Sequence, residues 1–115
     1  MANYILPFLQ KKENKYKAKK TVMDGITFDS KHEAERYCEL KLLLRAKKIS
    51  NLRLQERIEI VPKSKHGQAL YYVADFVYEE NGKTVVEDAK GVRTDVYRLK
   101  KRLVAERYGI IIKEV

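Results

Sequence analysis

The pair Asn81-Gly82 is the feature that most constrains the fold, because it joins two strand-like runs through a two-residue turn. The run before it, Leu70–Glu79, is rich in Tyr and Val, and the run after it, Lys83–Lys90, brings the chain back. Asn-Gly suits the two positive φ angles of a type I′ turn, whose twist matches that of paired strands. The sequence therefore predicts a hairpin with Glu80 opposite Lys83, which sets the register of every other pair.

Two aspartates fall opposite each other in this register. Counting back from the turn places Asp75 against Asp88, with Cβ atoms ~5 Å apart on one face of the sheet. Lys90 follows on the same face, whereas Glu87 alternates to the other. If the register slips by one residue, however, one aspartate moves to the opposite face, and Lys90 is then a solvated lysine at a strand end.

Opposed carboxylates destabilise a sheet unless something compensates their charge, and we expect that compensation to be a divalent cation. Mg²⁺ is commonly held by one or two carboxylates, with water and phosphate oxygens in its other positions. Lys90 would then orient an attacking water or offset the charge that develops on a phosphate.

Glu33 is a candidate third carboxylate. Ser30 is expected to cap a helix on which Glu33 shares the apolar face of Tyr37, Leu40 and Leu44. A glutamate at the head of that face would point toward the sheet and reach the metal directly or through a water. The alternative is a capping box, in which Glu33 returns a hydrogen bond to the cap.

The whole pattern predicts a mixed α/β fold. In order we expect a hairpin, a helix, three strands, a helix and a strand, at residues 21–28, 30–48, 51–61, 70–79, 83–90, 94–108 and 110–112. The last strand, helix and strand form a crossover that should place Ile110–Lys113 parallel to a central strand. Residues 21–115 would form one domain after a basic, flexible segment at residues 1–20.

The charge of the chain favours a polyanionic partner over generic solubility. Its 115 residues include 25 Lys and Arg against 16 Asp and Glu, a formal net charge of +9, which speeds encounter with nucleic acid. The candidates for phosphate contact, some of which must instead be solvated surface, are Lys15, Lys17, Lys19, Lys20, Arg98, Lys100 and Lys101. No apolar stretch approaches the roughly 20 residues of a membrane span, and no secretory signal is evident. We therefore expect a cytoplasmic protein of a bacterium or a phage-infected cell.

The strings Ala74-Asp75-Phe76 and Glu87-Asp88-Ala89-Lys90-Gly91 resemble the motif of the PD-(D/E)xK nuclease superfamily. With Phe28-Asp29-Ser30-Lys31-His32-Glu33, the chain looks most similar to the phage endonuclease I type of Holliday-junction resolvase and to a family of uncharacterised small phage proteins. The resemblance implies a restriction-endonuclease-like core, metal binding by Glu33, Asp75 and Asp88, and hydrolysis assisted by Lys90. Ala74 replaces the motif's proline, and Asp88 stands where Glu is commoner, which leaves Glu87 as a substitute ligand if the strand is bulged.

These observations together predict a DNA endonuclease that depends on Mg²⁺, with Mn²⁺ able to substitute. The resemblance alone suggests branched DNA as the substrate and a homodimer as the active form. Two alternatives stay open: a module that binds nucleic acid without cutting it, and a nuclease-like subunit of a larger DNA-processing assembly.

Overall fold

The computed structural model describes residues 20–90 and 93–115. The chain divides into two compact units, residues 1–42 and 43–115. The predicted basic segment at residues 1–20 lies outside the described residues except for Lys20.

The first unit begins with the predicted hairpin. Strands β1 (Thr21–Met23) and β2 (Ile26–Phe28) pair antiparallel, and the turn residues Asp24 and Gly25 have φ angles of 54° and 75°. The positive angles are those that the Asp-Gly pair predicted. Helix α2 (Lys31–Arg45) follows, and its Tyr37 packs against Phe28 of β2 with ring centroids 5.0 Å apart.

Helix α2 ends before Lys48, the end predicted from sequence. Lys47 adopts a left-handed φ of 61° and donates its N–H to the Leu44 carbonyl, while the Lys48 N–H reaches the Leu43 carbonyl. This pair of bonds is a Schellman motif, which closes a helix by satisfying its last carbonyl groups. The sequence carries no glycine here to signal the stop.

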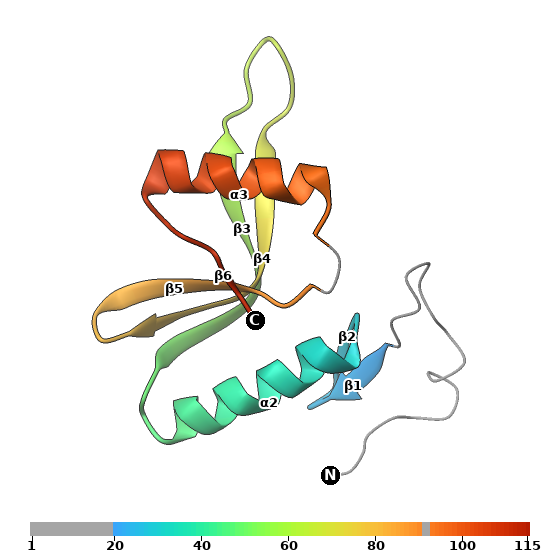
Figure 1. The fold of residues 1–115 in the computed structure, drawn as a ribbon, viewed down its shortest axis with the longest axis vertical. Coiled ribbons are helices and arrows are strands. Elements are labelled where there is room, and N and C mark those ends of the chain that lie inside the picture. Colours follow the sequence, from blue (N-terminus) through green and yellow to red (C-terminus); the bar gives the residue numbers. More distant parts are fainter. Residues whose placement is uncertain (1–19, 91–92) are drawn as a thin grey trace. The chain divides into compact units, whose positions relative to one another are not determined.

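The second unit is a four-stranded mixed sheet covered by a helix. Its strands β3 (Ser50–Val61), β4 (Leu70–Glu80), β5 (Lys83–Asp88) and β6 (Lys113–Glu114) lie in that order across the sheet. Strand β4 runs antiparallel to both β3 and β5, and β6 runs parallel to β5. Helix α3 (Asp95–Tyr108) lies across β3 and β4 (Figure 1). The mixed α/β class predicted from sequence is confirmed.

The hairpin between β4 and β5 has the predicted register. Asn81 and Gly82 have φ angles of 52° and 76°, Glu80 pairs with Lys83, and Phe76 pairs with Glu87. The next pair in this series is the two aspartates. Strand β5 ends at Asp88, however, two residues earlier than predicted.

Helix α3 closes the core of this unit. The Thr94 side chain caps its first turn by accepting from the Tyr97 N–H at 3.1 Å, and Gly109 ends it with a φ of 69°. The core that it completes contains Ile60, Tyr72, Ala74, Val77, Val86, Tyr97, Val104 and Ile112. Within the part of the chain that the structure describes, no helix is long and apolar enough to cross a membrane.

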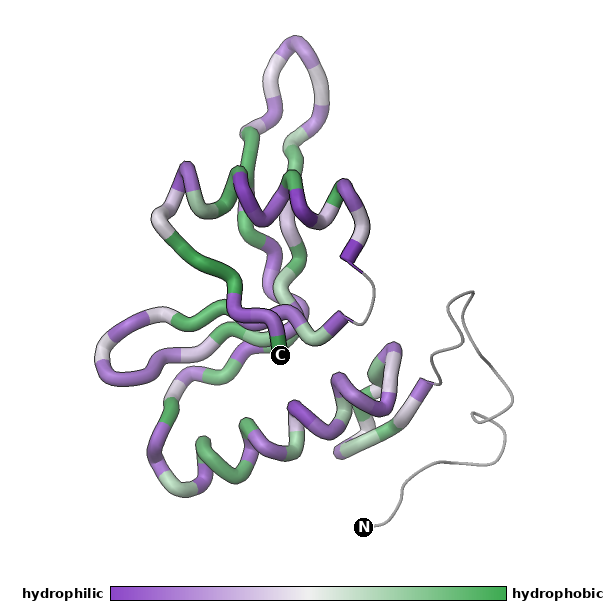
Figure 2. The backbone as a smooth tube through the Cα atoms, in the orientation of Figure 1, coloured by the Kyte–Doolittle hydropathy of each residue, from purple (hydrophilic) through white to green (hydrophobic). Residues whose placement is uncertain are grey.

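The predicted final strand Ile110–Ile112 is wrong in position. The ladder with β5 forms only at Lys113 and Glu114, which pair with Glu87 and Asp88. The hydrophobic stretch after α3 (Figure 2) instead leads the chain back to the sheet, with Ile112 2% exposed and Ile111 74% exposed. The run of isoleucines therefore resembles a buried strand in sequence, although the ladder to β5 forms only at the two residues that follow it.

The adjacent isoleucines allow a matched test of this packing. Ile112→Ala should lower the free energy of unfolding by about 3 kcal/mol, because it removes a buried side chain and leaves a cavity. The control Ile111→Ala makes the same change on an exposed side chain and should alter stability by less than about 0.5 kcal/mol. Urea unfolding of both variants measures the difference, and equal losses would contradict the placement of Ile112 in the core.

Candidate active site

Asp75 lies in β4 and is 1% exposed, so each of its oxygens must find donors within the protein. Oδ1 accepts from the Lys90 ammonium at 3.0 Å and from Gln55 Nε2 at 3.2 Å. Oδ2 accepts from the Ala89 N–H at 2.8 Å. The carboxylate is thus held by a charge on one side and a backbone amide on the other.

Asp88 is the last residue of β5 and has no exposed surface. Its Oδ2 accepts from the Tyr72 hydroxyl at 2.8 Å, and its Oδ1 accepts from the Lys90 N–H at 2.9 Å. The Arg93 guanidinium lies 3.6 Å from Oδ1, so its positive charge partly offsets the negative charge of the carboxylate. Burial, and after it the hydrogen bond to Asp88, raises the pKa of Tyr72 well above its usual value, so this hydroxyl stays a donor.

Lys90 joins the two aspartates. Its ammonium bonds Asp75, while its backbone N–H bonds Asp88. The structure therefore brings Asp75, Asp88 and Lys90 together, as the hairpin register predicted.

The same bonds explain why β5 is shorter than predicted. The N–H groups of Ala89 and Lys90 donate to the carboxylates of Asp75 and Asp88. An N–H used in this way is lost to the ladder with the neighbouring strand. The strand pattern in the sequence continues to Lys90, but the N–H groups of its last two residues bond to the acidic side chains instead of a neighbouring strand.

Two basic side chains lie beside the opposed carboxylates. Lys90 and Arg93 supply positive charge to them, and the predicted divalent cation stays a prediction. Tyr72 and Arg93 were not among the predicted site residues. A search for donors to a buried aspartate would have considered Tyr72 on the adjacent strand, but nothing local marks Arg93 as its partner.

Gln55 marks a distortion of β3 beside the site. Its φ is 53°, unusual for a residue other than glycine in a strand, although Leu54 and Glu56 on either side keep their pairing with β4. Such a conformation costs on the order of 1 kcal/mol and is concentrated at functional sites. Here it accompanies the hydrogen bond from Gln55 to Asp75.

Glu87, the substitute ligand suggested by the resemblance, has different partners. It is fully buried, accepts a hydrogen bond from Tyr78 and lies 4.0 Å from the Lys113 ammonium. Its contacts agree with the prediction that it alternates away from the aspartates.

Glu33 belongs to the first unit, and its contacts match the capping alternative. Its N–H donates to Ser30 Oγ at 3.1 Å, and its Oε1 accepts from the Asp29 N–H at 3.2 Å. The return bond thus reaches the residue before the cap, Asp29, where a capping box would use Ser30 itself. A role for Glu33 beside Asp75 and Asp88 stays a prediction.

The donor chemistry of the two aspartates is compatible with Mg²⁺. Among residues 20–90 and 93–115, no group of three or more His, Cys, Asp or Glu side chains is arranged to hold a metal ion. An ion at this place would therefore depend on Asp75 and Asp88 with water or substrate oxygens, a donor set that Mg²⁺ accepts. A carboxylate has about four lone-pair sites, and the hydrogen bonds above use three at Asp75 and two at Asp88, so neither carboxylate is exhausted.

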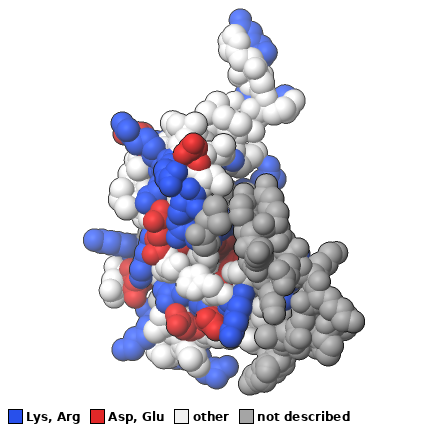
Figure 3. Space-filling model, turned by 45° about the vertical axis from the view of Figure 1, so that its right-hand side comes forward, with Lys and Arg blue, Asp and Glu red and all other residues white. Residues whose placement is uncertain are grey.

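The basic residues predicted to contact phosphate fall into two groups. Lys15, Lys17 and Lys19 lie outside the described residues, whereas Lys20 pairs with Asp29 at 3.1 Å. The other group, Arg98, Lys100 and Lys101, lies on α3. Figure 3 shows Lys and Arg side chains over much of the visible face, with acidic side chains interspersed.

Glu114 of β6 gives the site region a pH dependence. The hydrogen bond from Lys101 at 3.0 Å, followed by that from Tyr97 at 2.8 Å, lowers the pKa of Glu114 to about 2. A carboxylate whose pKa is depressed on folding stabilises the fold above its ordinary pKa and loses this contribution as the pH falls.

We expect wild type to be more stable than Glu114→Gln above the ordinary glutamate pKa of about 4.5, and the difference to shrink between that pH and about 2. Glu114 is partly exposed, so solvent screening keeps the effect small. Urea unfolding of both proteins across this pH range measures it. A difference that does not change with pH would show that the carboxylate charge contributes nothing.

Comparison with known proteins places the chain in a family. A family model described as "Protein of unknown function (DUF1064)" matches residues 13–114. No curated protein and no solved structure matches the chain. The family description names no activity, so any functional assignment must come from the residues themselves. Because the match covers nearly the whole sequence, the chain belongs to the DUF1064 family.

Proposed function

We propose that this protein is a Mg²⁺-dependent DNA endonuclease that hydrolyses phosphodiester bonds. The observation that carries the proposal is the contact of Lys90 with both buried aspartates at the end of the central hairpin. Two fully buried carboxylates beside a half-exposed ammonium are a costly arrangement for stability alone, and such clusters are typical of active sites.

The residues have distinct tasks in this proposal. Asp75 and Asp88 present carboxylate oxygens whose orientation is fixed by the Ala89 N–H and the Tyr72 hydroxyl. Mg²⁺ bound there would supply Lewis-acid stabilisation of a phosphate oxygen and a more acidic water. The Lys90 ammonium, 49% exposed, can reach solvent and offset the negative charge that builds up on the phosphate.

The resemblance of the same residues to the PD-(D/E)xK motif agrees with the proposal. The described element order, with a helix, three strands, a helix and a strand after the first hairpin, is compatible with a restriction-endonuclease-like core. From the same resemblance we propose branched DNA as the substrate, a homodimer as the active form, and action in the cytoplasm of a bacterium or phage-infected cell. Mn²⁺ is expected to replace Mg²⁺.

The central test is cleavage of linear, single-stranded, flapped and four-way DNA in Mg²⁺. Asp75→Asn, Asp88→Asn and Lys90→Gln should each reduce cleavage by at least about 100-fold, because each removes a charge that acts on the phosphate or its metal. DNA affinity measured in EDTA should change by less than about threefold, because phosphate contacts elsewhere provide the binding.

Glu35→Gln is the control for these variants, because it makes the same carboxylate-to-amide change on an exposed side chain of α2. Thermal unfolding of each variant separates loss of activity from loss of fold. If folded wild type cuts none of the four DNA structures with Mg²⁺ or Mn²⁺, the nuclease proposal fails.

Glu33→Gln separates the two roles of Glu33. Glutamine can still accept from the Asp29 N–H, so the helix start and the thermal stability should change little. If Glu33 also serves the metal, removing its charge should lower cleavage by about 10-fold or more. Unchanged cleavage with unchanged stability would leave Glu33 with capping alone.

A second function is favoured by one observation. Lys90, Tyr72 and two backbone amides already donate hydrogen bonds to the aspartates, as they would in a purely structural network within a nucleic-acid-binding module. Arg93 adds a nearby positive charge. Titration with Mn²⁺, followed by calorimetry, distinguishes the two. A nuclease site binds the ion and loses it in Asp88→Asn, whereas a structural network shows no binding in either protein.

A further inference from the structure

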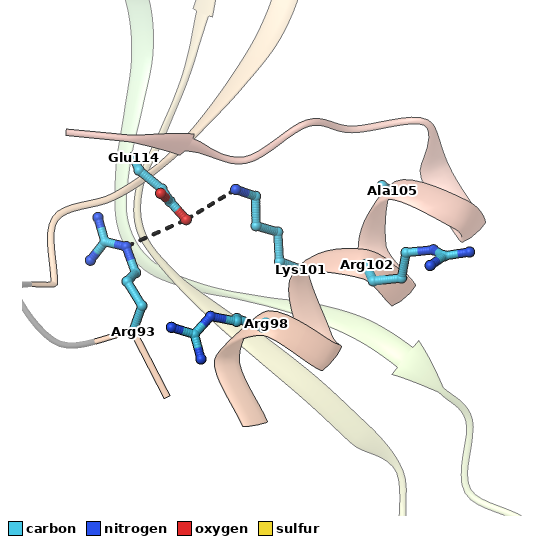
Figure 4. A pocket seen from close by; sticks show the side chains of 6 residues that line it. All are labelled: Arg93, Arg98, Lys101, Arg102, Ala105 and Glu114. Carbon is cyan, nitrogen blue, oxygen red and sulfur yellow. Dashed lines mark hydrogen bonds and ion pairs between the residues drawn. The ribbon is translucent and has the colours of Figure 1, made fainter. Parts of the chain in front are cut away.

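A basic pocket opens beside the candidate active site. It has a volume of about 580 Å³ and lies between α3, β6 and Arg93, which lies two residues before α3 (Figure 4). The residues that line it are Arg93, Arg98, Lys101, Arg102, Ala105 and Glu114. Four of them are cations and Ala105 alone lacks a polar side chain, so the pocket suits an anion rather than an apolar ligand.

Glu114, the one acid among these lining residues, is already engaged. Arg93 approaches it from one side at 3.4 Å and Lys101 from the other at 3.0 Å (Figure 4). One carboxylate oxygen of Glu114 thus pairs with both cations. The pocket thus has a fixed wall of three charged groups whose sum is positive.

Arg98 is the cation best placed to accept a ligand. Its side chain extends toward Arg93 (Figure 4), and it is paired with Asp95, whose side chain is fully exposed. An exposed pair of this kind contributes little and exchanges readily with another anion. A guanidinium that releases an exposed partner can bind a phosphate through charge-assisted hydrogen bonds.

Arg93 connects this pocket to the aspartates. Its Nη1 lies 3.6 Å from Asp88 and its Nε lies 3.4 Å from Glu114, so one guanidinium borders both places. An anion in the pocket is therefore separated from the candidate active site by a single side chain. Successive phosphates of a nucleic-acid strand provide two such anions at a fixed spacing, which an isolated phosphate or an acidic peptide does not.

We propose that this pocket binds a backbone phosphate of a nucleic acid, next to the phosphate that lies at Asp75 and Asp88. The adjacent reactive phosphate rests on the proposed function, whereas binding in the pocket does not. Of the three α3 cations predicted to contact phosphate, Arg98 and Lys101 line the pocket. Lys100 is not among the lining residues and would contribute only its general charge.

The test compares Arg98→Gln with Lys100→Gln in the full-length chain. Both remove one positive charge from the same helix, so non-specific electrostatics predicts equal effects. We expect Arg98→Gln to weaken binding of a duplex by about fivefold to tenfold near 0.1 M salt, and to lower the slope of log affinity against log salt by about one. Lys100→Gln should weaken binding less than twofold. Fluorescence anisotropy in EDTA gives both values without cleavage.

Equal effects of the two variants, or no effect of either, would overturn the phosphate site. So would binding of a poly-glutamate peptide that is as tight as DNA binding and equally sensitive to Arg98→Gln, because the pocket would then recognise acidic protein. Cleavage is scored in a separate assay with Mg²⁺. If Arg98→Gln specifically weakens DNA binding but the wild type cuts nothing, the phosphate pocket is supported and the nuclease proposal fails. If the wild type cuts DNA but Arg98→Gln and Lys100→Gln bind it equally well, the nuclease proposal is supported and the phosphate pocket fails.

Discussion

The left-handed turn at Asn81 and Gly82 determines which acidic residues meet in the second unit. With the register set there, Phe76 pairs with Glu87 and the two aspartates follow. A slip of one residue would bring Glu87 to the position of Asp88, and would separate it from Tyr78 and Lys113. Glu87 and Asp88 are both fully buried, each with partners of its own. The wrong register would therefore leave two buried charges without their partners.

Once the register is set, the acidic side chains reshape the backbone around them. Asp75 and Asp88 bind the N–H groups of Ala89 and Lys90, so the strand ends where the carboxylates need donors. Lys90 can then direct its ammonium at Asp75, and Arg93 approaches Asp88 from the segment before α3. The irregular end of β5 thereby brings the candidate active site and the basic pocket within reach of one guanidinium.

The parts that could be predicted from sequence are those set by neighbouring residues. Both Gly-containing hairpin turns and the convergence of Asp75, Asp88 and Lys90 follow from spacing along short segments. The parts that could not are non-local or lack a sequence signal: the Tyr72 donor, the charge of Arg93 beside Asp88, the φ of Gln55, the end of α2 at Arg45, and the placement of β6 after the isoleucines. The contacts of Tyr72, Arg93 and β6 depend on partners that only the folded chain brings close.

The uneven burial of the network bears on whether its role is structural or catalytic. A buried ion pair adds little net stability, because desolvation offsets most of the attraction, and an apolar pair would serve a purely structural purpose as well. Asp75 is almost completely buried, yet the Lys90 side chain that pairs with it is half exposed. A half-exposed lysine leaves one side of the network accessible to water and phosphate while the aspartates stay oriented from within. This uneven burial fits the proposed hydrolase, in which Lys90 would have to reach a phosphate while Asp75 stays oriented.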